Sequence, residues 1–128
     1  MPWTYVQTSG AMIGPAGRLV GVGYSGAGAG KNSPEMESVH NVGPIPCGEY
    51  TMGEPVNSHV HGPYAIPLHP DIENEMFGRD AFMCHGDSLV DPGNASEGCI
   101  IQAREVRVAM WESSDHRLQV VKELVLTA

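Results

Sequence analysis

The segment Gly78–Gln102, GRDAFMCHGDSLVDPGNASEGCIIQ, decides how this sequence is interpreted. It holds a histidine, His85, after a short apolar run, and a cysteine, Cys99, directly after a glycine. Cys99 follows His85 by fourteen positions, and the residues between them are rich in Gly, Asp, Pro and Asn. That composition is typical of a loop that reverses the chain. We therefore expect the loop to bring Cys99 beside His85.

A cysteine and a histidine brought together in this way predict nucleophilic chemistry. A thiol is mostly protonated near neutral pH, and a neighbouring imidazole can take its proton to give a thiolate–imidazolium pair. Gly98 directly precedes Cys99, and a glycine there lets backbone N–H groups point at a developing oxyanion. The alternative is that the two residues are ordinary parts of a core, since free cysteine is often just a small buried apolar residue.

Strand alternation separates the three cysteines. If residues 79–85 form a strand, His85 and Cys84 point to opposite faces, so Cys84 is expected to be a buried core thiol. Cys99 is then the better nucleophile. Cys47 lies in a turn bounded by prolines, and we expect it to be structural. Three scattered cysteines do not make a disulfide framework.

The rest of the chain predicts one mainly β domain over residues 1–128. Its 128 residues include 16 glycines and 10 prolines, and short β-like runs alternate with turn residues. Apolar side chains follow helical spacing over Ala103–Ser113, which predicts one helix after Cys99. Strands at this spacing favour a β-sandwich or barrel. They are expected within residues 3–7, 18–24, 43–52, 64–68, 79–85 and 118–126.

The motif Ser96–Ile100, SEGCI, with His85-Gly86 upstream, resembles the signature of the L,D-transpeptidases. That family carries a His-Gly motif and then a Ser/Thr-His-Gly-Cys motif. The sequence is more similar to the type VI secretion L,D-transpeptidase effectors, whose nucleophile lies in an Ala-Ser-x-Gly-Cys-Ile context, as at Ala95–Ile100 here. Further motifs fall in the order of that family: GYSG at 23–26, GPIP at 43–46 with Gly48 and Tyr50, Leu68 with Pro70, and Gly78-Arg79.

The resemblance implies an L,D-transpeptidase-like fold, with Cys99 as nucleophile and His85 as general base. It implies that Gly98, Ser96 and Gly86 support the oxyanion and the loop. The implied substrates are peptidoglycan tetrapeptide stems, attacked at the third residue with loss of the terminal D-alanine. Water would complete an L,D-carboxypeptidase reaction, and an amine would complete an exchange or a cross-link. Such effectors are injected into rival bacteria, which implies secretion-apparatus components and a cognate immunity protein as partners.

The chain departs from the common transpeptidase motif at two places. Glu97 stands where that motif has histidine, and Ile101 stands where it has arginine. The role usually given to that second histidine is therefore not carried over. Two groups are open as the partner that orients His85: the carboxylate of Asp87 and a backbone carbonyl.

Three further residues are candidates for contact with substrate. Arg79 precedes His85 by six positions, so a regular strand places both side chains on one face. An arginine there can hold the terminal carboxylate of a stem peptide with two hydrogen bonds, or it can neutralise the many acids around it. Asp87 follows His85 closely, and Tyr24 lies in the GYSG motif.

A metal site is the alternative for a second group of residues. His59-Val60-His61 would put two imidazoles on one strand face, and His69 or Asp71 would complete a zinc site and make the protein a zinc amidase. No HExxH or CxxC motif accompanies them, so we expect no metal and no cofactor. A third alternative is a non-catalytic peptidoglycan-binding module, which would be expected to lose Cys99 or His85.

Charge and hydropathy exclude other classes of function. A formal net charge of −8 disfavours nucleic acid and anionic membrane surfaces as partners. No apolar run approaches the roughly 18 residues of a membrane span. The N-terminus has no basic region and no apolar core, so we expect synthesis in the cytoplasm without a signal peptide, and export by a dedicated secretion system.

Overall fold

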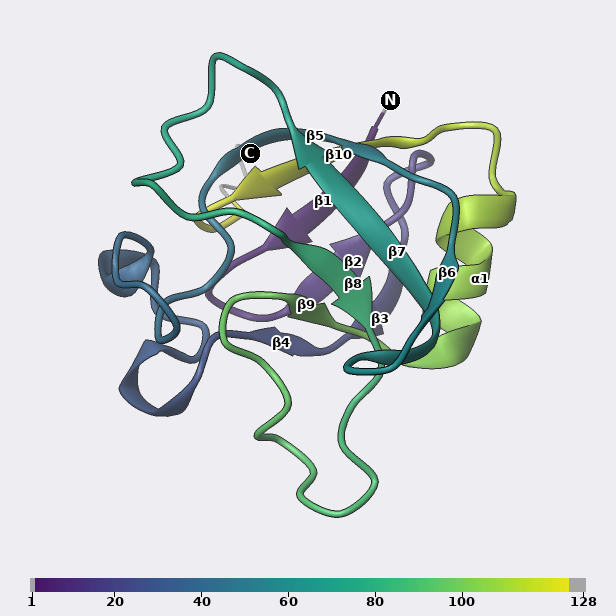
Figure 1. Ribbon diagram of the computed structural model, residues 1–128. Helices are drawn as coiled ribbons and strands as arrows, with labels where there is room; N and C mark the ends of the chain where they lie inside the picture. Colours follow the sequence, from purple (N-terminus) through teal and green to yellow (C-terminus); the bar gives the residue numbers. More distant parts are fainter. Residues whose placement is uncertain (1, 125–128) are drawn as a thin grey trace.

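A computed structural model describes residues 2–124 and has a mainly β architecture with one α-helix among those residues (Figure 1). The helix is α1 (Arg104–Glu112), and two 3-10 turns lie at Gly28–Gly30 and Pro34–Met36. The predicted fold class is confirmed. The strands are β1 (Trp3–Val6), β2 (Ala11–Ile13), β3 (Leu19–Val22), β4 (Tyr24–Ser25), β5 (Gly48–Met52), β6 (Val56–Ser58), β7 (Gly62–Pro70), β8 (Met83–His85), β9 (Ile100–Ile101) and β10 (Arg117–Val121).

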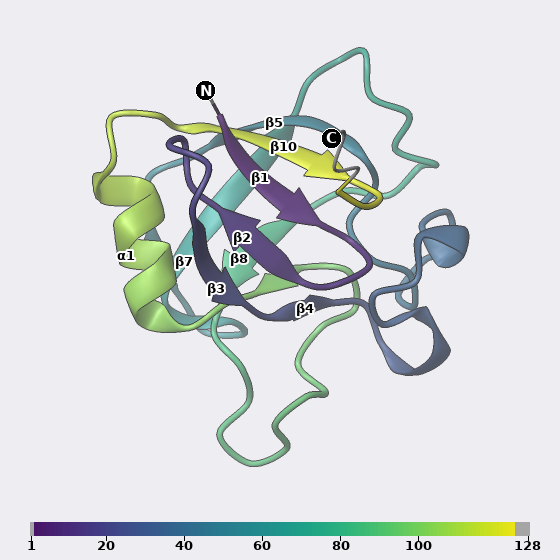
Figure 2. The same ribbon diagram turned by 180° about the vertical axis from the view of Figure 1, so that it is seen from behind.

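The strands form one mixed sheet that curls round on itself. Their order is β3-β2-β1-β10-β5-β7-β8-β9-β4, with β6 paired to β7. The first and last strands of this order, β3 and β4, are consecutive in the chain and are separated only by Gly23. The two ends of the sheet therefore meet, which gives the barrel-like outline seen from both sides in Figures 1 and 2.

Gly23 permits this closure because two other backbone segments, at Gly10 and Ile101, come close to it. Its N–H donates to the carbonyl oxygen of Gly10 at 2.8 Å. A Cβ atom at position 23 would lie 1.6 Å from the carbonyl oxygen of Ile101, which immediately follows Ile100 in β9. No side chain fits in that space.

The core lies inside the curled sheet and beneath α1. The helix packs against β7 and β8 and buries Val106 and Met110, and fully buried strand residues such as Tyr5 and Leu118 complete the core. β1 pairs in parallel with β10, so strands from near both ends of the chain lie side by side. Within residues 2–124, no helix has both the length and the apolar character to cross a bilayer.

Several predicted strand boundaries are wrong. The strand expected over 79–85 covers only Met83–His85, because Ala81 adopts φ +63° and breaks the extended backbone. The run 18–24 is interrupted at Gly23, and the run 64–68 extends to Gly62–Pro70. The terminal strand is Arg117–Val121, and residues 125–126 of the predicted run lie outside the described residues. The helix predicted over 103–113 is confirmed as Arg104–Glu112.

Candidate active site

His85 ends β8, and Cys99 directly precedes β9, the strand that pairs with β8. The two strands are parallel, with Cys84 beside Ile100. Both of those residues are fully buried in the core, as predicted for Cys84, and alternation within β8 turns His85 toward the opposite face. Cys99 lies in the bend just before β9, close to the start of β8.

The imidazole of His85 is held in one tautomer. Its Nδ1 lies 2.8 Å from the carbonyl oxygen of Gly86, and since a carbonyl only accepts, Nδ1 carries the proton. The carbonyl of Gly86, and not the carboxylate of Asp87, therefore orients the ring. Nε2 is buried and has no hydrogen-bond partner among the described residues, the Cys99 thiol included. Its lone pair is available to accept a proton, which is what a general base needs.

Burial favours the neutral form of both groups. It raises the pKa of the Cys99 thiol, and the carboxylate of Glu97 acts in the same direction. Burial also lowers the pKa of the His85 imidazole, and His61 and Arg107 lower it further. At neutral pH these shifts favour a thiol near a neutral imidazole over the thiolate–imidazolium pair that the sequence suggested.

The turn that carries Cys99 is fastened by two serine hydroxyls. Ser96 Oγ accepts from the N–H groups of Gly26 at 2.9 Å and Gly98 at 3.0 Å, and it donates to the Cys99 carbonyl at 2.6 Å. Ser25 Oγ donates to the Gly98 carbonyl at 2.8 Å. These bonds fix the backbone of the turn. The N–H of Gly98 itself is bonded to Ser96, so any oxyanion donor in this turn is a different backbone N–H group.

Arg79 is buried behind the same turn. A Cβ atom on Gly98, which has φ +140°, would lie 2.5 Å from Arg79 Nη2, so this glycine and the guanidinium are packed together. The expectation that Arg79 shares a strand face with His85 is wrong, because the strand does not reach residue 79. Its guanidinium donates to four backbone carbonyls: those of Glu37 at 2.5 Å, Gly43 at 2.9 Å, Pro44 at 2.8 Å and Glu97 at 3.2 Å.

Tyr24 and Asp87, the other candidates for substrate contact, are hydrogen-bonded to each other. Tyr24 Oη donates to Asp87 Oδ1 at 2.6 Å and accepts from the Ala95 N–H at 2.9 Å. The Asp87 carboxylate also accepts from the N–H groups of Ser88 and Gly93. This network braces the long loop between β8 and β9 that extends from the body of the molecule in Figure 1.

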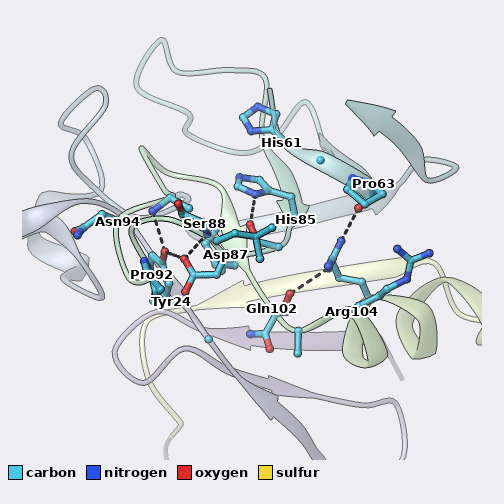
Figure 3. A pocket seen from close by; sticks show the side chains of 18 of the residues that line it. Tyr24, His61, Pro63, His85, Asp87, Ser88, Pro92, Asn94, Gln102 and Arg104 are labelled. Atoms are coloured by element: carbon cyan, nitrogen blue, oxygen red, sulfur yellow. Dashed lines mark hydrogen bonds between the residues drawn. The ribbon is translucent and has the colours of Figure 1, made fainter. Parts of the chain in front are cut away.

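A cavity of about 1140 Å³ borders His85. In Figure 3, Tyr24 and Asp87 lie toward one end of the lining and Arg104 toward the other, with Gln102 between them. Cys99 is not among the residues that line it. The cavity therefore adjoins the general-base candidate and not the thiol itself.

The family model of the Tlde1 domain matches residues 21–126. The chain belongs to the Tlde1 domain family. This is the type VI secretion L,D-transpeptidase effector-like family, and the matched residues include the turn that carries Cys99 and every residue that lines the cavity. No curated protein and no solved structure matches the chain.

Sequence analysis did not assign His61 of this Tlde1 domain to the Cys–His site. Its ring stacks on the ring of His85, with the centroids 4.4 Å apart and the planes at 27°. The contact joins the turn between β6 and β7 to the end of β8. No local sequence pattern predicts that these two segments lie close together. His61 had been considered only as part of a metal pair.

Arg107 is the second residue that sequence analysis missed. It is buried, and it donates through Nε to the carbonyl of Gln102 at 3.1 Å and through Nη1 to those of Pro63 at 2.9 Å and Tyr64 at 2.8 Å. It therefore ties α1 to β7 and lines the cavity. One sequence signal was available, since Arg107 places a charge among the apolar residues of a predicted helix.

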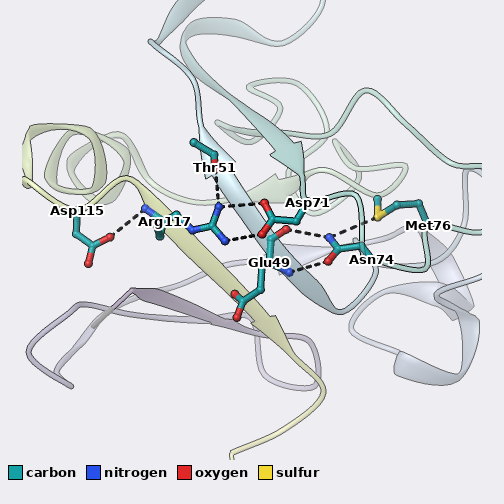
Figure 4. Close-up of polar contacts among 7 residues, drawn as sticks. All are labelled: Glu49, Thr51, Asp71, Asn74, Met76, Asp115 and Arg117. Atoms are coloured by element: carbon teal, nitrogen blue, oxygen red, sulfur yellow. Dashed lines mark hydrogen bonds and ion pairs between the residues drawn. The ribbon is translucent and has the colours of Figure 1, made fainter.

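The alternative metal site does not assemble in the described part of the Tlde1 domain. His59 and His61 lie in the turn between β6 and β7, so the expectation that they share a strand face is wrong. Asp71 is paired with Arg117 at 2.6 Å (Figure 4). Within residues 2–124, no group of three or more His, Cys, Asp or Glu side chains is arranged to hold a metal ion.

Proposed function

We propose that this Tlde1 domain is a cysteine-dependent L,D-transpeptidase and L,D-carboxypeptidase that acts on peptidoglycan tetrapeptide stems. The observation that carries the proposal is the fixed tautomer of His85, which leaves Nε2 as a proton acceptor at the end of β8, the strand that pairs with β9 directly after Cys99. Family membership supports this class of reaction. As part of the same proposal, the domain is a secreted antibacterial effector that acts in the periplasm of a target bacterium and has a cognate immunity protein.

The proposed reaction begins with attack of Cys99 Sγ on the carbonyl carbon of the third stem residue. His85 Nε2 takes the thiol proton during the attack, because the resting pair is neutral. The C–N bond to the fourth residue then breaks, His85 returns the proton to the departing amine, and a thioester remains on Cys99. Water releases a tripeptide, and the amine of a D-amino acid or of a second stem gives an exchanged or cross-linked product.

The rigid support of the turn suits this role. A nucleophile is effective when its geometry is set before the substrate arrives. Ser96, Ser25 and Arg79 all reach the backbone of residues 96–99 and leave that turn little freedom.

Incubation with purified muropeptides, with the products identified by mass, tests the proposal. Tetrapeptides should become tripeptides or exchanged tetrapeptides with the native protein. Cys99→Ala should abolish turnover, whereas Cys47→Ala, which alters a half-buried thiol bonded to Gln7, should retain it. Full turnover by Cys99→Ala would rule out the mechanism.

Two further arms separate the alternative functions. EDTA should leave turnover unchanged, and a loss that zinc restores would favour a zinc amidase. Sedimentation with intact peptidoglycan, without any turnover by the native protein, would favour a binding module.

Periplasmic expression in a susceptible bacterium should be toxic only when Cys99 is present, and equal toxicity of Cys99→Ala would contradict the effector role.

A further inference from the structure

The end of the cavity formed by α1 carries positive charge that the proposed mechanism does not use. Arg107 is only 5% exposed, and its Nε and Nη1 are bonded to three backbone carbonyls. Its Nη2 makes no hydrogen bond to any described residue, so this buried guanidinium keeps an unused donor edge. Arg104 lines the same cavity, and its guanidinium lies over the ring of Tyr64 at 5.4 Å from the centroid.

The unused edge of Arg107 lies next to the catalytic histidine. A Cβ atom on Gly86, the residue after His85, would lie 2.9 Å from Arg107 Nη2. Both Gly86 and Arg107 line the cavity. In Figure 3, Arg104 lies beyond Gln102, at the end of the lining away from Tyr24 and Asp87. The two arginines therefore border the same cavity as His85.

The start of α1 adds to this positive end. Ala103 lines the cavity, and no side chain caps the helix that begins at Arg104. The first N–H groups of a helix lack intrahelical partners and carry partial positive charge. Glu105 is the acidic residue of the first turn, and it does not line the cavity. In a chain of net charge −8, this end of the cavity is suited to an anion.

The proposed reaction brings a carboxylate, that of the terminal D-amino acid, close to this end of the cavity. Cys99 comes just before β9, His85 ends the neighbouring parallel strand β8, and Gly86, the next residue, adjoins Arg107 of α1. The acyl group of the substrate lies at Cys99, and the departing amine must be reached by His85 Nε2. In an α-amino acid the carboxylate carbon is two bonds from that amine, which is close enough for the carboxylate to enter the cavity that His85, Arg104 and Arg107 line.

We propose that Arg107 and Arg104 form a subsite for the α-carboxylate of the D-amino acid that leaves, and of the free D-amino acid that enters in exchange. This inference rests on the proposed function. The departing and the entering D-amino acid use one site. Attack of an amine on the thioester is the reverse of the step in which the terminal D-amino acid leaves. An arginine edge and a carboxylate match in shape and charge. The subsite makes the domain selective for stems with a free C-terminal carboxylate.

The experiment compares a tetrapeptide stem that has a free C-terminal carboxylate with its C-terminal carboxamide. Native protein should use the acid at least about tenfold better in kcat/KM, as expected for a charged hydrogen-bonded pair. Arg104→Gln and Arg107→Lys should lower this ratio toward one, mainly through a higher KM for the acid. Arg107→Lys keeps the charge but lacks the planar edge.

Controls make the outcomes distinct. Arg18→Gln, which alters an exposed arginine outside the cavity, should keep the native ratio. Thermal unfolding of each variant identifies any loss of folding, and Arg104→Gln keeps the test valid if Arg107→Lys does not fold. Equal use of acid and amide by native protein, or an unchanged ratio in folded variants, would overturn the subsite. Turnover of neither peptide by native protein would instead overturn the proposed function.

Discussion

Burial of a neutral thiol near a neutral imidazole fixes how Cys99 should respond to alkylation. Because the pKa of Cys99 is raised, its reaction with iodoacetamide should accelerate only above pH of about 8.5, the value for a free thiol. Glu97→Gln removes a nearby negative charge that disfavours the thiolate, so it should lower the midpoint. Alkylation rates measured across pH, with mass detection of the modified cysteine, check this. A native midpoint below pH of about 7 would restore the ion-pair interpretation.

The histidine of the pair sets the acid side of the pH profile. His85 must be unprotonated to act as a base, and burial lowers its pKa. The acid limb of kcat/KM should therefore lie below pH of about 6.5, and His85→Ala should reduce turnover by at least about 100-fold. The measurement is kcat/KM on a tetrapeptide stem from acid to neutral pH. An acid limb above the ordinary value for histidine would contradict the burial argument.

At the scale of elements, the turn between β6 and β7 tunes the same histidine through His61. The stacked His61 ring lowers the pKa of His85. His61→Phe keeps an aromatic ring in that place but removes the ionisable group that disfavours an imidazolium at His85, so the pKa of His85 should rise and the acid limb should move to higher pH. His61→Ala should cause the same shift and also lower kcat, because the packing is lost. His69→Phe, on the exposed part of β7, is the matched control and should leave the profile in place.

The turn before β9 depends on Arg79 in a comparable way. Arg79→Ala leaves four backbone carbonyls without their donor, so the free energy of unfolding should fall by about 2–4 kcal/mol. Urea unfolding monitored by circular dichroism measures this. If Arg79 bound substrate instead, Arg79→Ala would keep native stability and raise only KM.

Local pattern explains which parts of the site could be predicted. The opposite faces of His85 and Cys84 follow from alternation within β8, and the loop to Cys99 follows from its turn residues. Alternation cannot be extended from His85 back to Arg79, because the positive φ of Ala81 interrupts the extended backbone between them. The role of Arg107 depends on carbonyls more than forty positions away, which no local pattern encodes.

At the scale of the whole molecule, the sequence predicts the class of fold but not how the sheet closes. Runs of β-like residues and one helical segment indicate a β-rich domain. The parallel pairing of β1 with β10, and the meeting of β3, β4 and β9 at Gly23, join segments that are distant in the chain. In the sequence Gly23 is one of 16 glycines, and nothing local distinguishes it.

Closure of the sheet at Gly23 leaves no room for a side chain at that position. A Cβ atom there would overlap the carbonyl oxygen of Ile101 at 1.6 Å, and backbone cannot move aside as a side chain tip can. Gly23→Ala should therefore lower the free energy of unfolding by at least about 3 kcal/mol. It should also lower turnover, because Gly23 lines the cavity beside Tyr24. Urea unfolding and muropeptide turnover measure the two effects.

Gly14→Ala is the matched control for that substitution. Its Cβ atom would meet only side chains, the nearest being Val20 Cγ2 at 3.3 Å, which can shift slightly. The cost should stay within about 1 kcal/mol, and turnover should be native, because Gly14 is remote from the cavity lining. If Gly23→Ala were as stable and as active as Gly14→Ala, β4 and β9 would have room to separate. The barrel would then not need its closure to hold Cys99 and His85 together.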